Sequence, residues 1–109
     1  MLIDKPMIQL GRYNTKRITG LRELGNTTQI ITSSEDHYMT IWEATTGLLL
    51  SSVYQPSYPT SIDVNKEGTV AFIGTQQGVF RIYDISDRMS PKLLQQMRFF
   101  SNPMPVTML

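Results

Sequence analysis

The sequence predicts an all-β chain built from antiparallel four-stranded blades of a β-propeller. The first observation is an internal repeat: Trp42 and Glu43 close one unit, and Tyr83 and Asp84 close the next, 41 residues further on. The second is that each unit consists of short runs rich in β-branched and aromatic residues, separated by turns that contain Gly, Asn or Pro. A period of about 40–45 residues made of short strands is typical of propeller blades.

The first unit contains four predicted strands. The run 29–33 is short and rich in β-branched residues, which is typical of a strand buried on both faces. Ile18 and Leu21 are expected to supply core side chains from the strand before it. Gly47 is expected to hold the positive φ of the tight turn before the last strand. The predicted strands span residues 18–24, 29–33, 38–42 and 48–54.

The second unit follows the same plan. Its turns fall at residues 66–68 and 76–78, where glycines again end the turn. The connection 86–91 is longer than its counterpart in the first unit. The predicted strands span residues 60–64, 69–74, 79–84 and 92–99.

These elements divide the chain into four parts. Residues 1–17 are expected to form the last strand of a preceding blade and a linker, and residues 105–109 to open a third repeat. The two repeats between them span residues 18–58 and 59–104. A propeller avoids open sheet edges by closing a ring of about 4–8 blades, so we expect an incomplete ring with uncovered end faces.

Seven residues of the two units stand at the positions of a characteristic repeat motif. They are Ser34, Asp36, Trp42, Gly47, Thr75, Tyr83 and Asp84. On these residues the chain resembles the WD-repeat family of β-propellers, over about residues 18–109. The resemblance implies rigid blades in which these residues are structural, and it implies a buried hydrogen-bond chain that runs from a turn Asp through a His and a Ser or Thr to the Trp ring nitrogen. In the first repeat Asp36 would begin that chain, and Ser34 would bind the ring of Trp42.

The sequence also departs from the family pattern. Asn14 and Gln55 stand where the family has its His, and Gln77 replaces the turn Asp of the second repeat. Gln77 and Tyr83 are therefore not expected to rebuild the same polar chain. We expect both blades to be stabilised more by packing than by buried polar chains, with Trp42, Phe80 and Tyr83 in the blade core.

Composition excludes several classes of site. The ten basic and nine acidic residues nearly balance, which argues against general attraction to nucleic acid or membranes. There is no cysteine, and His37 is the single histidine, so thiolate and His-rich metal sites are excluded. No apolar run approaches the ~18–20 residues that span a bilayer, which argues against membrane insertion. These observations suit an intracellular address, in the cytoplasm or on the cytoskeleton.

No catalytic, cofactor-binding or metal site is predicted, and no cofactor is expected. His37 is expected to be an exposed loop residue, and Glu35 and Asp36 are adjacent in a turn, the ordinary pattern of a solvated loop. The resemblance implies a non-catalytic protein-protein interaction scaffold, part of a larger propeller in a multiprotein assembly, with a cytoskeletal or ciliary one as a candidate. Its expected partners are other proteins, and the remaining blades or a partner would cover the open faces. The alternative is a non-catalytic portion of a propeller enzyme whose active site lies in other blades.

Overall fold

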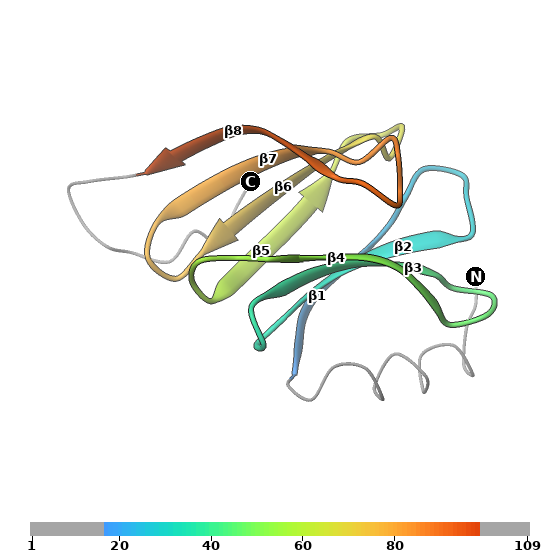
Figure 1. The fold of residues 1–109 in the computed structure, drawn as a ribbon, viewed down its shortest axis with the longest axis horizontal. Helices are drawn as coiled ribbons and strands as arrows, with labels where there is room; N and C mark the ends of the chain where they lie inside the picture. The colour runs from blue at the N-terminus through green and yellow to red at the C-terminus, as the bar shows by residue number, and fades with distance from the viewer. Residues whose placement is uncertain (1–16, 99–109) are drawn as a thin grey trace.

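The computed structural model describes residues 17–98, which form eight β-strands and, within that range, no helix. They make two four-stranded antiparallel sheets with the strands in chain order (Figure 1). Blade one contains β1 (Ile18–Glu23), β2 (Gln29–Ser34), β3 (Tyr38–Glu43) and β4 (Leu48–Tyr54). Blade two contains β5 (Pro59–Val64), β6 (Val70–Thr75), β7 (Val79–Asp84) and β8 (Lys92–Arg98). The expected strand of a preceding blade, Asn14 and the opening of a third repeat lie outside the described residues.

The predicted strands 48–54 and 79–84 agree with β4 and β7, and the predicted start of the last strand at residue 92 agrees with β8, whereas the other five predicted strands are wrong by one residue at one or both ends. Residue 99, the predicted end of the last strand, lies outside the described residues. The residues that the observed strands contain beyond the predicted bounds are mostly polar. Ser34 pairs with Ile18, and Glu43 pairs with both Gln29 and Leu48. Backbone pairing uses N–H and C=O groups that every such residue carries, so the ladder continues beyond the apolar run from which a strand is predicted.

The repeat of the sequence is also a repeat of the structure. Strands β5, β6 and β7 each begin 41 residues after β1, β2 and β3. Irregularities in strand pairing recur at the same places, between Ile41 and Trp42 and between Ile82 and Tyr83. Strand β8 begins 44 residues after β4, because the connection 85–91 is longer than 44–47, as the sequence predicts.

The two blades lie face to face, with β1 and β5 in contact (Figure 1). Alternate residues of a strand point to opposite faces, so each blade sends one set of apolar side chains into a shared core. The shared core consists of buried Leu24, Ile31, Met39 and Ile41 from blade one, and Ile62, Ala71, Ile73, Tyr83 and Ile85 from blade two.

A second, smaller cluster lies on the outer face of blade one, the face opposite the shared core. It contains Ile30, Trp42 and Ala44, with Leu21 packed against them. Trp42 and Tyr83 are buried, as predicted, whereas Phe80 is only half-buried. In the part of the chain that is described, the two sheets remain separate and do not close into a ring.

Candidate functional site

Trp42 makes the buried polar contact of blade one, but with a different partner from the one that the resemblance implies. Its ring nitrogen Nε1 donates to Oγ1 of Thr32, 2.9 Å away, and both residues are 0% exposed. The expected partner, Ser34, instead donates its hydroxyl to the carboxylate of Asp36. Trp42 pairs with Ile30 across the sheet, so Thr32, two residues along, shares its face and lies within diagonal reach of the ring. The alternation of side chains along β2 is therefore the sequence signal that could have identified Thr32 as the partner of the Trp42 ring.

Blade two contains a polar cluster of its own. Nε2 of Gln55 donates to the Tyr83 hydroxyl oxygen at 3.1 Å, and Nη1 of Arg81 donates to the same oxygen at 3.0 Å. Gln55 is 0% exposed although it lies in the connection between β4 and β5. Gln77 is exposed and takes no part, as expected. A glutamine at the position of the family's histidine thus binds the tyrosine that replaces the tryptophan, a contact that sequence reasoning missed.

The remaining motif residues stabilise turns. The Thr75 hydroxyl donates to the Val79 carbonyl at 3.0 Å and accepts from its N–H at 3.1 Å, which closes the β6–β7 turn. Gly47 has a φ of 75°, as predicted. The Asp84 carboxylate accepts hydrogen bonds from the Ser86 hydroxyl and N–H, which lower the pKa of Asp84. The seven motif residues are therefore spread over separate local contacts and do not converge on one site.

Two kinds of feature were sought in residues 17–98: groups of metal ligands and apolar helices. No group of three His, Cys, Asp or Glu side chains there could hold a metal ion. No helix within this range has the length and apolar character needed to cross a membrane.

Arg88 joins the two blades at one end. Its guanidinium donates to Oε1 of Gln29 in blade one at 2.7 Å, and to the carbonyl oxygens of Gly68 and Ile85 in blade two at 2.6 and 2.7 Å. It lies in the connection 85–91, whose extra length relative to 44–47 gives room for it. Partial burial lowers the pKa of Arg88 without removing its charge.

The Arg88→Ala variant is expected to lose about 1–3 kcal/mol of unfolding free energy, because the two carbonyl oxygens and the Gln29 amide lose a charged donor. Equilibrium urea unfolding of the chain measures the loss. Arg98→Ala, at the exposed end of β8, is the matched control and should change stability by less than about 0.5 kcal/mol. Equal effects of the two substitutions would contradict a joining role for Arg88.

Glu43 is a hydrogen-bond acceptor at the end of β3. Its carboxylate accepts from the hydroxyls of Thr28 at 2.5 Å and Thr45 at 2.9 Å, and from Nε2 of Gln29 at 3.5 Å. The Thr28 hydrogen bond is the largest of the causes that hold the pKa of Glu43 below its usual value. The ionised carboxylate is therefore the form that the fold favours.

A lowered pKa in the folded state means that the unfolded chain binds the proton more readily. The stabilisation from Glu43 is thus present above its unfolded pKa and is lost as the pH falls through the folded pKa. We expect Glu43→Gln to flatten the decline of stability between about pH 5 and pH 3. Urea unfolding at a series of pH values measures this slope. Glu23→Gln, at the exposed end of β1, is the control, and an unchanged slope in Glu43→Gln would refute the assignment.

The open face of blade two is the face turned away from the shared core, and it carries Phe72, Phe80 and Ile82. The repeat makes these residues equivalent to Ile31, Met39 and Ile41 of blade one, 41 positions earlier. The blade-one residues are 0% exposed because blade two covers them, whereas those of blade two are only half-buried. The rings of Phe72 and Phe80 stack with centroids 6.4 Å apart. The open face thus has the apolar composition of a surface that a further blade or partner covers.

Comparisons with known proteins agree with this geometry. No family model matches the chain. Pre-rRNA-processing protein crb3/ipi3 of Schizosaccharomyces pombe is 33% identical over 54 residues, which cover 50% of this chain and 12% of that protein. A crystal structure of RRP9 WD40 repeats and a structure of U3-55K each match with a TM-score of 0.72 at 14% identity. Each match covers 82% of this chain and 28% of the solved one, so the chain spans a minor part of the proteins it resembles. By strand order, repeat and likeness to these structures, the described chain has the fold of two blades of a WD40-repeat β-propeller.

Proposed function

We propose that this chain supplies two blades of a larger propeller that acts as a non-catalytic protein-interaction scaffold. The open face of blade two is the observation that carries the proposal. Phe72, Phe80 and Ile82 stand where blade one is fully covered, so this face is built to be covered in turn. In the repeat, the outer face of blade one, which carries Trp42, corresponds to the face of blade two that packs into the shared core. Ile30 and Trp42 on the outer face of blade one are already buried, so the open face of blade two is the end of the pair that is suited to a further blade or to a partner.

The assembly that we propose is one that processes ribosomal RNA precursors inside the cell. The support is the relative crb3/ipi3, which is described as a pre-rRNA-processing protein. None of the three proteins reported above is described as cytoskeletal or ciliary, so those candidates from the sequence find no support. We propose that the partners of this scaffold are other proteins and that it does not contact nucleic acid.

Density-gradient sedimentation of the tagged full-length protein from its own cells tests the scaffold role. We expect it to sediment with particles that contain unprocessed ribosomal RNA, and we expect unprocessed RNA to accumulate when the protein is depleted. Phe72→Asp combined with Phe80→Asp should release the protein from these particles, because two charges replace apolar surface that must be covered.

Met89→Asp is the matched control, since Met89 lies in the connection 85–91, is 66% exposed and should leave the sedimentation unchanged. Sedimentation of the wild-type protein as a free species would overturn the scaffold proposal. Sedimentation with tubulin-containing material would instead support the cytoskeletal candidate and overturn the ribosomal one.

A further inference from the structure

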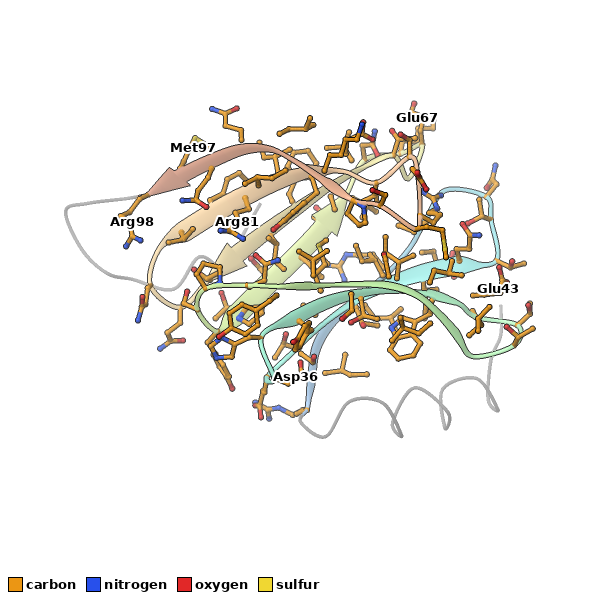
Figure 2. All side chains as sticks on the ribbon, in the orientation of Figure 1. Asp36, Glu43, Glu67, Arg81, Met97 and Arg98 are labelled. Carbon is orange, nitrogen blue, oxygen red and sulfur yellow. The ribbon has the colours of Figure 1, made fainter. Side chains whose placement is uncertain are left out.

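Four aromatic side chains gather at one end of blade one and form what we call the aromatic end: His37, Tyr38, Tyr54 and Tyr58. His37 stacks on Tyr54, with ring centroids 5.5 Å apart and planes 14° from parallel. Tyr38 meets Tyr54 edge to face at 5.6 Å, and Tyr58 meets His37 in the same way at 6.3 Å. The rings come from the β2–β3 turn, the start of β3, the end of β4 and the β4–β5 connection. Figure 2 labels Asp36, which lies in the same turn.

The aromatic end is not a requirement of the blade, and blade two supplies the internal comparison. The equivalents of His37 and Tyr38 in the repeat are Gly78 and Val79, and the residue of β8 that corresponds to Tyr54 is Arg98. Blade two builds the same four strands without counterparts to the rings of His37, Tyr38 and Tyr54. The rings therefore serve something other than the architecture that the two blades share.

His37 keeps its place at a conformational cost. Its φ is 79°, close to the 81° of Gly78 at the equivalent turn position. A residue with a side chain pays about 1–2 kcal/mol for this left-handed conformation, which glycine adopts freely. Nδ1 of His37 donates to the Gln55 carbonyl 3.2 Å away, and its ring stacks on Tyr54. Side chains held in such conformations cluster at binding sites, which makes this turn a candidate.

Two rings of the aromatic end are available to a partner. Tyr38 is 39% exposed and Tyr54 is 57% exposed, although each is large and mostly apolar. Exposed tyrosines grouped in this way are typical of interaction surfaces, since they offer a large contact area and lose little conformational entropy. The faces of these rings carry partial negative charge and attract cations.

The charges beside the rings favour the same kind of partner. Glu35 and Asp36 lie in the turn that holds His37, and hydrogen bonds from Tyr58 and Arg17 lower the pKa of Glu35, so its carboxylate is ionised. Arg17 is already paired with Glu35 at 2.9 Å. Stacked RNA bases would also suit tyrosine faces, but nucleic acid needs a basic groove around them, and these carboxylates oppose phosphate.

We propose that the aromatic end binds a lysine- or arginine-bearing segment of a partner protein, whose cations lie over Tyr38 and Tyr54 beside the carboxylates of Glu35 and Asp36. The inference rests on the scaffold function and names the chemistry of one partner. It assigns this partner to the end of blade one rather than to the open face of blade two. The two surfaces can therefore be disabled separately.

Fluorescence anisotropy with labelled octaarginine as the probe tests the proposal on the whole chain. We expect the wild-type chain to bind at low salt. Tyr38→Ala combined with Tyr54→Ala should weaken binding about fivefold or more, whereas Tyr38→Phe combined with Tyr54→Phe should stay within about twofold because the ring faces remain. Far-UV circular dichroism establishes that each variant is folded. Leu48→Ala combined with Leu94→Ala, two exposed side chains on β4 and β8, is the control and should bind as the wild type does.

Equal binding by the alanine and phenylalanine variants, or no binding by the wild-type chain, would overturn the proposal. Tighter binding of octauridylate than of octaarginine, lost in the alanine variant, would overturn it in favour of RNA. These failures leave the scaffold function standing, because sedimentation with a large assembly tests that function with the wild-type protein. A chain that binds octaarginine but sediments alone would instead overturn the scaffold function.

Discussion

The Trp42→Ala variant is expected to lose about 3–5 kcal/mol of unfolding free energy. Trp42 is 0% exposed and packs with Ile30, Ala44 and Leu21 on the outer face of blade one. Its removal leaves a cavity the size of an indole ring. It also deprives the buried Thr32 hydroxyl of the 2.9 Å hydrogen bond from Nε1. A domain is stable by only about 5–15 kcal/mol, so this loss is a large fraction of the total.

Urea unfolding followed by far-UV circular dichroism measures the effect of Trp42→Ala, because the variant lacks the tryptophan whose fluorescence would otherwise report unfolding. Trp42→Phe is the graded control, since it keeps an aromatic ring but removes the donor. Thr32→Val, alone and combined with Trp42→Phe, completes a double-mutant cycle for the hydrogen bond. A loss below about 1 kcal/mol in Trp42→Ala would contradict its burial in the blade core.

The Gly68→Ala variant is expected to lose about 2–5 kcal/mol, the sum of two separate costs. Gly68 has a φ of 74°, a conformation that disfavours any residue with a Cβ. A Cβ at this position would also lie 2.6 Å from the backbone nitrogen of Gly25 and from the carbonyl carbon of Leu24. The turns of the two blades thus touch backbone to backbone, and a methyl group would force them apart.

Gly47→Ala is the matched control for Gly68→Ala. Gly47 has a φ of 75° and lies in a turn within blade one, so this variant carries the conformational cost of about 1–2 kcal/mol without separating the blades. Gly25→Ala should resemble Gly68→Ala, because its Cβ would lie 2.7 Å from the Glu67 carbonyl oxygen. Urea unfolding compares the three variants. Equal losses in Gly47→Ala and Gly68→Ala would show that contact between the turns contributes nothing.

Several expectations from the sequence had to be revised at the level of single contacts. The partner of the Trp42 ring is Thr32 rather than Ser34, because the face of a strand, and not the nearest motif residue, decides which hydroxyl the ring meets. His37 was expected to be an exposed loop residue. It is instead half-buried between the rings of Tyr54 and Tyr58. Tyr54 ends β4 and Tyr58 lies in the β4–β5 connection, so both rings come from a later part of the chain than His37. The sequence of the β2–β3 turn alone therefore does not predict that His37 is half-buried.

The sequence by itself determined the repeat, the strands and the turns of this protein. These features follow from alternation along the chain and from turn residues such as Gly47, so their causes lie within a few residues of their effects. Only the tertiary structure decided which faces meet and what joins them. Arg88 reaches Gln29 across 59 positions, and Gly68 touches Gly25 across 43, at distances that depend on how one sheet lies on another. Sheet packing is set by many weak contacts acting together, and no local pattern encodes it.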